Sequence, residues 1–254
     1  MNNRNFLWLC VLCSLFAIFY SCEPDTPTTE TCTASNAIRN KYEEDAIRLA
    51  LRIQQNGANA NQVVVSESLI ERMLAALATV ENSTSLAADS VLTNYSIKTL
   101  SYPAYDEFTV EVDTSVAWVH QWMQGQRLTG NTAIDNLMTT YGLDVENFLS
   151  LSVNFATLKS NEPLNIAALV DDFEAISGVL NVDFANTPPS GSDIEAVDLG
   201  SIIKLTYTVG YDAPAAPGSC SGTCDFSRSW VFDTQIDNGL CQATFVESFG
   251  DPAP

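Results

Sequence analysis

Histidine and basic side chains are scarce in this chain of 254 residues. It has one histidine, and its 11 lysines and arginines stand against 31 aspartates and glutamates, a formal net charge of −20. A surface of this sign repels phosphate, so nucleic acid is not an expected partner. The single histidine, His120, is expected on a helix surface and leaves little material for a metal centre.

The common catalytic motifs are missing as well. The sequence has no HExxH, no phosphate-binding GxxxxGK[ST], no GxGxxG, no Ser/His/Asp arrangement and no calcium loop of the EF-hand type. We therefore expect no cofactor, no bound metal and no enzymatic activity. Asp171, Asp172 and Glu174 lie close together and are expected to form a solvated helix face; a carboxylate pair for acid–base chemistry is the alternative.

No apolar run after residue 22 is long enough to cross a membrane, but one lies before it. The run from Phe6 to Tyr20, behind Arg4, is about 15 residues long, which is short for a membrane span and typical of the apolar core of a signal peptide. The sequence predicts a signal peptide over residues 1–21. An uncleaved anchor and an ordinary secreted protein are the alternatives.

The end of this run, Phe19, Tyr20, Ser21 and Cys22, resembles the lipobox of bacterial lipoproteins in the looser Bacteroidota form. The resemblance implies cleavage before Cys22, a lipid on that cysteine and membrane attachment as an outer-membrane lipoprotein of the cell envelope. Residues 22–36 are rich in proline, threonine and acidic side chains, which favours a flexible tether. Acidic residues after the lipidated cysteine resemble surface-export signals, which implies exposure at the cell surface.

Two further stretches resemble exported Bacteroidota proteins. Asp89, Ser90 and Val91 are similar to an O-glycosylation site of such proteins, which implies a glycan on Ser90. The stretch from Trp118 to Met138 follows the pattern W-x6-G-x3-TGN-x2-ID-x2-M and is similar to parts of lipoproteins of that group. This second resemblance implies no activity.

Hydrophobic periodicity predicts an α+β fold. Alternating residues predict strands, whereas apolar residues at helical spacing with flanking cap residues predict helices. The expected strands are residues 45–53 (with a helix as the rival interpretation), 108–112, 149–158, 179–184 and 201–212 and a C-terminal hairpin around residues 237–239. The expected helices are residues 66–81, 114–124, 131–141 and 164–177.

The order strand, loop, helix, strand occurs twice in this pattern, about 100 residues apart. We interpret it as a duplication of two α+β units, residues 37–145 and residues 146–254, the second bearing a disulfide-linked hairpin. Antiparallel sheets covered by helices on one face are expected, with ferredoxin-like half-units as a plausible topology.

The cysteines predict two disulfides. Of the seven, Cys10 and Cys13 leave with the signal peptide and Cys22 takes the lipid; the others are Cys32, Cys220, Cys224 and Cys241. An even number in an oxidising compartment favours pairing, and four cysteines allow three pairings. Small residues between Cys220 and Cys224 let those two meet, which leaves Cys32 for Cys241.

Other interpretations of Cys220 are weaker. Residues 218–222, GSCSG, match a nucleophile elbow, but such an elbow needs a following helix and a histidine base, and here a strand follows. One C-x3-C pair is too little for a zinc site, and a redox site of thioredoxin type would use C-x-x-C.

Tryptophans are the remaining candidates for a binding site. Trp118 and Trp122 are four residues apart and share one helix face. Core packing is the simpler interpretation; an exposed aromatic surface that includes Trp230 is the alternative. We expect a non-catalytic binding or accessory module for a protein or glycan. A protease-inhibitor or chaperone-like module is suggested by fold analogy alone, and an enzyme using Cys220 is the third hypothesis.

Overall fold

The computed structural model describes residues 32, 34–185, 191–212, 220, 224–237 and 241–252. The predicted signal peptide and the lipidation site Cys22 lie outside the described residues, as do most of the tether and the tip of the predicted C-terminal hairpin. In the described part of the chain, no helix is both long and apolar enough to cross a membrane.

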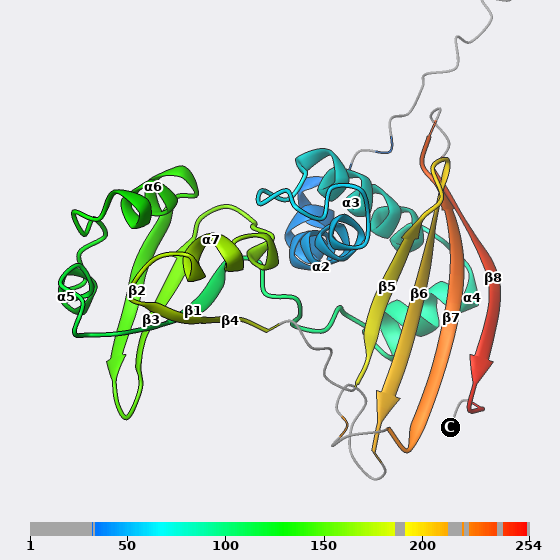
Figure 1. The fold of residues 1–254 in the computed structure, drawn as a ribbon. Coiled ribbons are helices and arrows are strands. Elements are labelled where there is room, and N and C mark those ends of the chain that lie inside the picture. The colour runs from blue at the N-terminus through cyan, green and yellow to red at the C-terminus, as the bar shows by residue number, and fades with distance from the viewer. Residues whose placement is uncertain are drawn as a thin grey trace, which may run out of the picture. The chain divides into compact units, whose positions relative to one another are not determined.

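Helices and two four-stranded antiparallel sheets confirm the predicted α+β class (Figure 1). The helical segments are α2 (Asn36–Gln55), α3 (Glu67–Glu81), α4 (Leu86–Asp89), the π-helix η1 (Ser90–Asn94), α5 (Val119–Met123), α6 (Thr132–Thr140), the 3₁₀ helix η2 (Ile166–Ala168) and α7 (Val170–Glu174). The strands are β1 (Glu107–Val112), β2 (Leu143–Ser150), β3 (Asn154–Ser160), β4 (Val179–Asp183), β5 (Asp193–Asp198), β6 (Ile202–Tyr211), β7 (Phe226–Gln235) and β8 (Gln242–Gly250).

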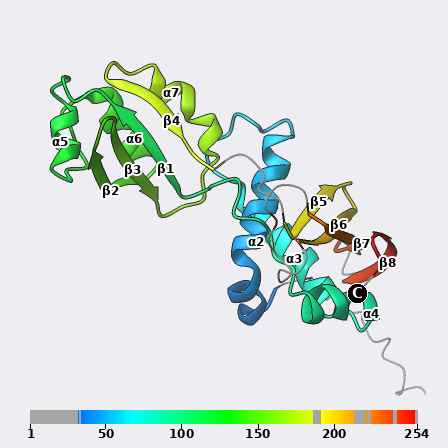
Figure 2. The same cartoon turned by 90° about the horizontal axis from the view of Figure 1, so that it is seen from below.

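The C-terminal sheet has the strand order β5-β6-β7-β8. Alternate residues of β6 are buried, as the sequence pattern predicts, and they pack with α2, α3 and the α4–η1 segment in one core. Figure 2 shows α2 and α3 beside this sheet. Because the helices cover one face only, the other face carries threonine, serine and charged side chains, including the Lys204–Asp233 ion pair at 2.9 Å.

Residues 107–183 form a second sheet with its own core. Its strand order is β2-β3-β1-β4, and helical segments connect β1 to β2 and β3 to β4. All neighbouring strands are antiparallel, so this is the βαββαβ arrangement of ferredoxin-like units. The inward residues of the strands share one core with α5, α6 and α7, so these helices lie on one face of the sheet.

The predicted boundary between two units at residues 145 and 146 is wrong, because it falls inside β2. The core of the C-terminal sheet joins residues on both sides of the ferredoxin-like unit in the sequence. Loop 57–65 contacts the ferredoxin-like unit through an isolated bridge between Val64 and Leu164. The buried Asn165 donates to the backbone oxygens of Ala60 and Gln62 at 2.7 and 3.2 Å.

The strand predicted over residues 45–53 is wrong; this segment belongs to the 20-residue helix α2. Tyr42, Ala46, Leu49 and Ala50 are all buried and follow each other at helical spacing. In a strand Ala50 would lie on the polar face and Ile53 on the apolar face, whereas Ala50 is buried and Ile53 is only half-buried. The rival helical interpretation is therefore the correct one.

The single strand predicted through Leu149, Leu151 and Phe155 is also wrong. The chain turns at residues 151–153, so that Leu149 lies opposite Phe155 on the neighbouring strand. Neither expected copy of the repeat keeps its predicted first strand, since one is a helix and the other a hairpin. The pattern of the elements therefore gives no support to a duplication.

The other expected elements are confirmed, with the short helices shorter than predicted. In α6 the Asn131 side chain accepts hydrogen bonds from the backbone N–H of Ala133 and Ile134, at 3.0 and 3.5 Å. Gly142 follows this helix with a φ of 59°, the left-handed conformation expected after a helix end. Strand β1, the helix α3 and the pairing of β7 with β8 also match the sequence pattern.

Candidate interaction edge of the C-terminal sheet

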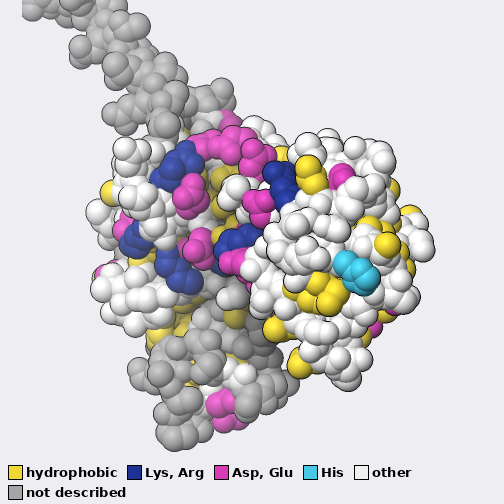
Figure 3. Space-filling model, turned by 90° about the vertical axis from the view of Figure 1, so that its left-hand side faces the viewer, with side chains coloured by type: hydrophobic (Ala, Val, Ile, Leu, Met, Phe, Trp, Pro, Cys, Tyr) yellow, Lys and Arg dark blue, Asp and Glu magenta, His cyan; other side chains and the backbone are white. Residues whose placement is uncertain are grey.

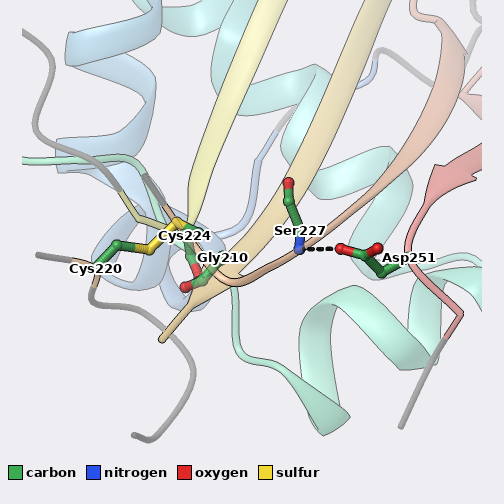
Figure 4. Close-up of a disulfide and its surroundings, with 6 residues drawn as sticks. Gly210, Cys220, Cys224, Ser227 and Asp251 are labelled. Carbon is green, nitrogen blue, oxygen red and sulfur yellow. Dashed lines mark hydrogen bonds between the residues drawn. A yellow bond between two sulfur atoms is a disulfide. The ribbon is translucent and has the colours of Figure 1, made fainter. Parts of the chain in front are cut away.

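The four cysteines that follow Cys22 form the two predicted disulfides. Cys32 is bonded to Cys241 with a Cα–Cα distance of 5.5 Å, and Cys220 to Cys224 with a Cα–Cα distance of 5.1 Å. Figure 4 shows the second disulfide close to Gly210, near the end of β6. Because its sulfur is bonded to Cys224, Cys220 has no thiolate to act as a nucleophile in this state.

Gly210 fits the surroundings of this disulfide because it lacks a side chain. A Cβ at this position would lie 2.6 Å from the Cys224 sulfur and 3.1 Å from the backbone oxygen of Gly191. The glycine therefore lets the disulfide pack directly against the end of β6.

The tryptophans do not form a binding surface, which corrects that hypothesis. Trp118, Trp122 and Trp230 are only 7%, 0% and 5% exposed. Trp118 and Trp122 pack edge to face in the core of the ferredoxin-like unit, with ring centroids 5.0 Å apart, and the Trp118 indole donates to the backbone oxygen of Ser177. Trp230 belongs to the core beneath the C-terminal sheet, where it stacks near Tyr95. The simpler interpretation, core packing, is correct.

The polar candidates form no catalytic cluster. His120 is exposed, as the cyan side chain in Figure 3 shows, and its Nε2 lies 3.0 Å from the backbone oxygen of Thr114. Asp171, Asp172 and Glu174 are exposed on α7, and Glu174 accepts a hydrogen bond from the Val182 backbone. Among the described residues, no group of three or more potential ligands could hold a metal ion.

Ser90, the predicted glycosylation site, lies at the start of η1. Its side chain is half-buried, and its hydroxyl donates to the backbone oxygen of Leu86 at 2.9 Å. The hydroxyl therefore has a hydrogen-bond partner in the preceding helix α4.

A pocket of about 680 Å³ lies between the end of α2, the start of α3 and the end of β7. Its charged groups are bonded to one another: Arg72 binds Asp198 at 3.1 Å and Asp237 at 3.0 Å. The Gln54 amide that lines it bonds backbone groups of Gln62, Val64 and Ser66. These contacts join the helices to strand ends, and none of the described residues that line the pocket has a buried side-chain polar atom without a hydrogen-bond partner.

A partly buried polar network joins α2 to α3 and to residues 98–99. Asp45 accepts hydrogen bonds from the backbone and hydroxyl of Thr99 at 2.8 and 2.7 Å and pairs with Lys98 at 2.9 Å. Glu81 accepts from Lys41 at 2.6 Å and from the Tyr42 hydroxyl. Burial raises the pKa of Tyr42 and its bond to Glu81 raises it further, so the phenol stays protonated. Since each group has a partner, the network is structural.

Figure 3 shows acidic and basic side chains interleaved on one side of the molecule. The ion pairs Arg48–Glu44, at 3.2 Å within α2, and Arg39–Glu71, between α2 and α3, are partly exposed. Ion pairs of this exposure contribute little to stability, and they leave the large acidic excess of the chain uncompensated.

Strand β8 stands out among the edge strands of the two sheets, which are β2, β4, β5 and β8. It is nine residues long and carries one charged residue, Glu247, whereas β5 carries three acidic residues in six and β2 two in eight. Its side chains Phe245, Val246 and Phe249 are 40%, 45% and 52% exposed. Charged residues normally protect an edge against pairing with another chain, so β8 is the least protected long edge.

Both ends of β8 are held in place. The Cys32–Cys241 disulfide precedes its first residue. At the other end, Asp251 accepts a hydrogen bond from the Ser227 backbone at 2.8 Å, drawn in Figure 4, and donates its own backbone N–H to the Ser227 oxygen at 2.8 Å. Gly250, at a φ of 99°, has no space for a side chain against the backbone of Ser227. β8 is therefore anchored at both ends.

No family model, curated protein or solved structure matches this chain. The geometry of β8 therefore has to be interpreted from its own residues. Sequence reasoning identified the hairpin but missed its edge, although the stretch QATFVESFG, with a single charge in a strongly acidic chain, is a visible signal. Which strand of a sheet is an edge depends on the strand order, and local periodicity does not contain that information.

Proposed function

We propose that this chain is an exported lipoprotein of the bacterial cell envelope, resembling the Bacteroidota type, that acts as a non-catalytic binding module. In this proposal Cys22 carries the lipid and the module faces an oxidising space, as an outer-membrane lipoprotein exposed at the cell surface. The observation that carries the proposal is the pairing of all four later cysteines in two disulfides. Disulfides persist in secreted and periplasmic proteins and are rare where thiols are kept reduced.

A protein is the better supported ligand class of the two expected. The exposed tryptophan surface expected for either ligand class is not available, because the three tryptophans assigned to it are buried. An exposed, weakly charged strand edge offers backbone hydrogen bonds, which suit an extended protein segment.

Metabolic labelling with a palmitate analogue in a cell that exports lipoproteins tests the anchoring part of the proposal. The wild-type chain should incorporate label and fractionate with membranes, while Cys22→Ser should lose both properties. Cys32→Ser is the matched control, because it removes a cysteine only ten positions away and should keep the label. Equal labelling of wild type and Cys22→Ser would contradict the proposal.

A protease-inhibitor or chaperone-like module is the second candidate. The βαββαβ order of residues 107–183 favours it, since the analogy that suggested this function rests on ferredoxin-like units. Adding the purified chain to a panel of serine, cysteine and metalloproteases tests it. Stoichiometric inhibition of one protease would support this function, whereas no inhibition at a tenfold molar excess would remove it.

A further inference from the structure

We propose that β8 is a docking edge to which an extended, basic segment of another protein adds as a fifth strand of the C-terminal sheet. This inference rests on the proposed function as a protein-binding module and names both the site and the chemistry of the partner. The docking edge consists of residues Gln242–Gly250.

The open side of β8 offers backbone groups that can form hydrogen bonds with a partner strand. Among the described residues β8 pairs with β7 alone, so within that part of the chain the backbone groups on its other side have no strand partner. An exposed strand of this kind is a template for β-strand addition. Of the four edges, β4 has five residues and β5 six, and β5 and β2 carry more acidic side chains than β8. β8 is therefore the most favourable edge for a partner strand.

β8 is preorganised to receive a partner strand. The disulfide at Cys241 and the hydrogen bonds around Asp251 fix the two ends of β8. Arg228 adds a hydrogen bond of 3.0 Å to the Ser248 hydroxyl within the strand. Binding therefore reduces the conformational entropy of the partner segment alone, because the receiving strand is already ordered in the free protein.

Exposed apolar side chains of β8 offer contacts to an added strand. Phe245 lies opposite Phe232 and therefore on the side of the helices, and Phe249 lies opposite Ser229 and therefore on the open face. Both are exposed, as is Val246 in the bulge between the two halves of β8. Apolar side chains of an added strand would contact these residues on both faces of the sheet.

The net charge of the chain distinguishes between the possible partners of β8. A second copy of this chain would bring another formal charge of −20 to the contact and is repelled. A basic segment is attracted by the same field, and this speeds its association. Among the described residues no basic group pairs with Glu247, so a lysine or arginine of the partner can bind its carboxylate.

Hydrogen exchange on the full, lipidated chain in detergent, with a synthetic strand as the probe, tests the inference. The probe is a nine-residue peptide in which lysine alternates with valine and threonine. Two control peptides have proline at alternate positions, which prevents pairing, or glutamate in place of lysine. We expect the basic peptide to protect backbone amides of residues 242–250 and to leave β5 unprotected. The proline and glutamate peptides should give no protection.

Substitutions on the edge complete the test. Val246→Lys places a cation beside the incoming basic strand and should weaken peptide binding about tenfold or more, whereas the uncharged, strand-compatible Val246→Thr should bind as wild type does. Leu199→Lys puts the same charge at the turn after β5, where Leu199 is 59% exposed, and should leave binding unchanged. Thermal unfolding checks that each variant folds.

Three results would overturn the inference. They are equal protection of the β5 amides by the basic peptide, peptide binding that Val246→Lys leaves unchanged, and a dimer whose β8 amides are protected without peptide. A chain that fails to take up lipid but still binds the peptide at β8 would contradict the anchoring part of the proposed function and leave the docking edge standing. A lipidated chain whose β8 amides the peptide does not protect would contradict the docking edge and leave the anchoring part of the proposed function standing.

Discussion

Gly210 shows how a single residue permits the Cys220–Cys224 disulfide to sit against the sheet. Gly210→Ala would place a methyl group 2.6 Å from the Cys224 sulfur, so strand or disulfide must shift. We expect the free energy of unfolding to fall by about 1–3 kcal/mol, the usual range for overpacking. Urea denaturation followed by circular dichroism measures it.

A double-mutant cycle assigns that loss to the sulfur. In the Cys220→Ala/Cys224→Ala background the sulfur is absent, so Gly210→Ala should lose clearly less stability than in the wild type. An undiminished loss in this background would show that the backbone of Gly191, at 3.1 Å, is the decisive contact instead.

Trp122 is a test of core packing against ligand binding. It is fully buried, and we expect Trp122→Ala to lower the free energy of unfolding by about 3–5 kcal/mol. Met123→Ala is the matched control, since Met123 is 44% exposed and its truncation should change stability little. A near-neutral Trp122→Ala would contradict the buried position.

Residue-level predictions from the sequence succeeded where chemistry alone decides. The disulfides follow from an even number of cysteines and one small-residue spacing, and both pairs are confirmed. The role of Trp118 and Trp122 did not follow, because helical spacing shows that they share a face but not what that face packs against. Only the sheet behind α5 determines that they are buried.

The contact between α2 and α3 makes stability depend on pH. Burial raises the pKa of the Glu81 carboxyl, but hydrogen bonds from Lys41 and Tyr42 outweigh burial, and the net pKa is below its ordinary value. A depressed carboxyl pKa contributes stability above the unfolded pKa, near 4.3, and that stability is lost as pH falls through the folded value.

Comparing wild type with Glu81→Gln measures this contribution. The wild-type free energy of unfolding should decrease more between pH 6 and pH 3 than that of the variant, because glutamine does not titrate. Denaturation curves at closely spaced pH values give the difference. Parallel pH profiles for the two proteins would show that Glu81 does not contribute through its charge.

At the scale of elements, the predicted secondary structure was wrong where a short segment was interpreted without the residues on either side of it. Nine residues of α2 alternate in hydrophobicity, and only the longer stretch with buried Tyr42 and Ala46 shows helical spacing. In LSLSVNF the alternation continues through the turn between β2 and β3, where no glycine or proline marks the reversal. Helices α3 and α6 were predictable because their apolar stripes are long and bounded by Ser66 and Asn131.

At the scale of the whole molecule, the long-range disulfide links the start of the described chain to the residue before β8. Cys32 and Cys241 are 209 residues apart, so the chain-entropy model gives this link about 5 kcal/mol, against about 2 kcal/mol for the link between cysteines four residues apart. Cys32→Ser/Cys241→Ser should therefore unfold at clearly lower denaturant than Cys220→Ser/Cys224→Ser. The opposite order would contradict this assignment.

The arrangement of the whole chain was the part least accessible from sequence. Local patterns gave the α+β class and most strands, but they do not indicate that helices near the start of the described chain share a core with strands near its end. For the same reason the boundary between the cores and the exposed edge β8 could not be predicted. Both depend on strand order, which is fixed by packing over more than 100 residues of intervening chain.

Mass spectrometry of the chain purified from an exporting cell tests the central claim, an anchored module with paired thiols, most directly. The account predicts an N-terminal residue Cys22 that carries the mass of a lipid, and Cys32, Cys220, Cys224 and Cys241 that react with an alkylating agent only after reduction. An unlipidated Cys22 still preceded by residues 1–21, or alkylation of Cys220 and Cys224 in the native protein, would contradict it.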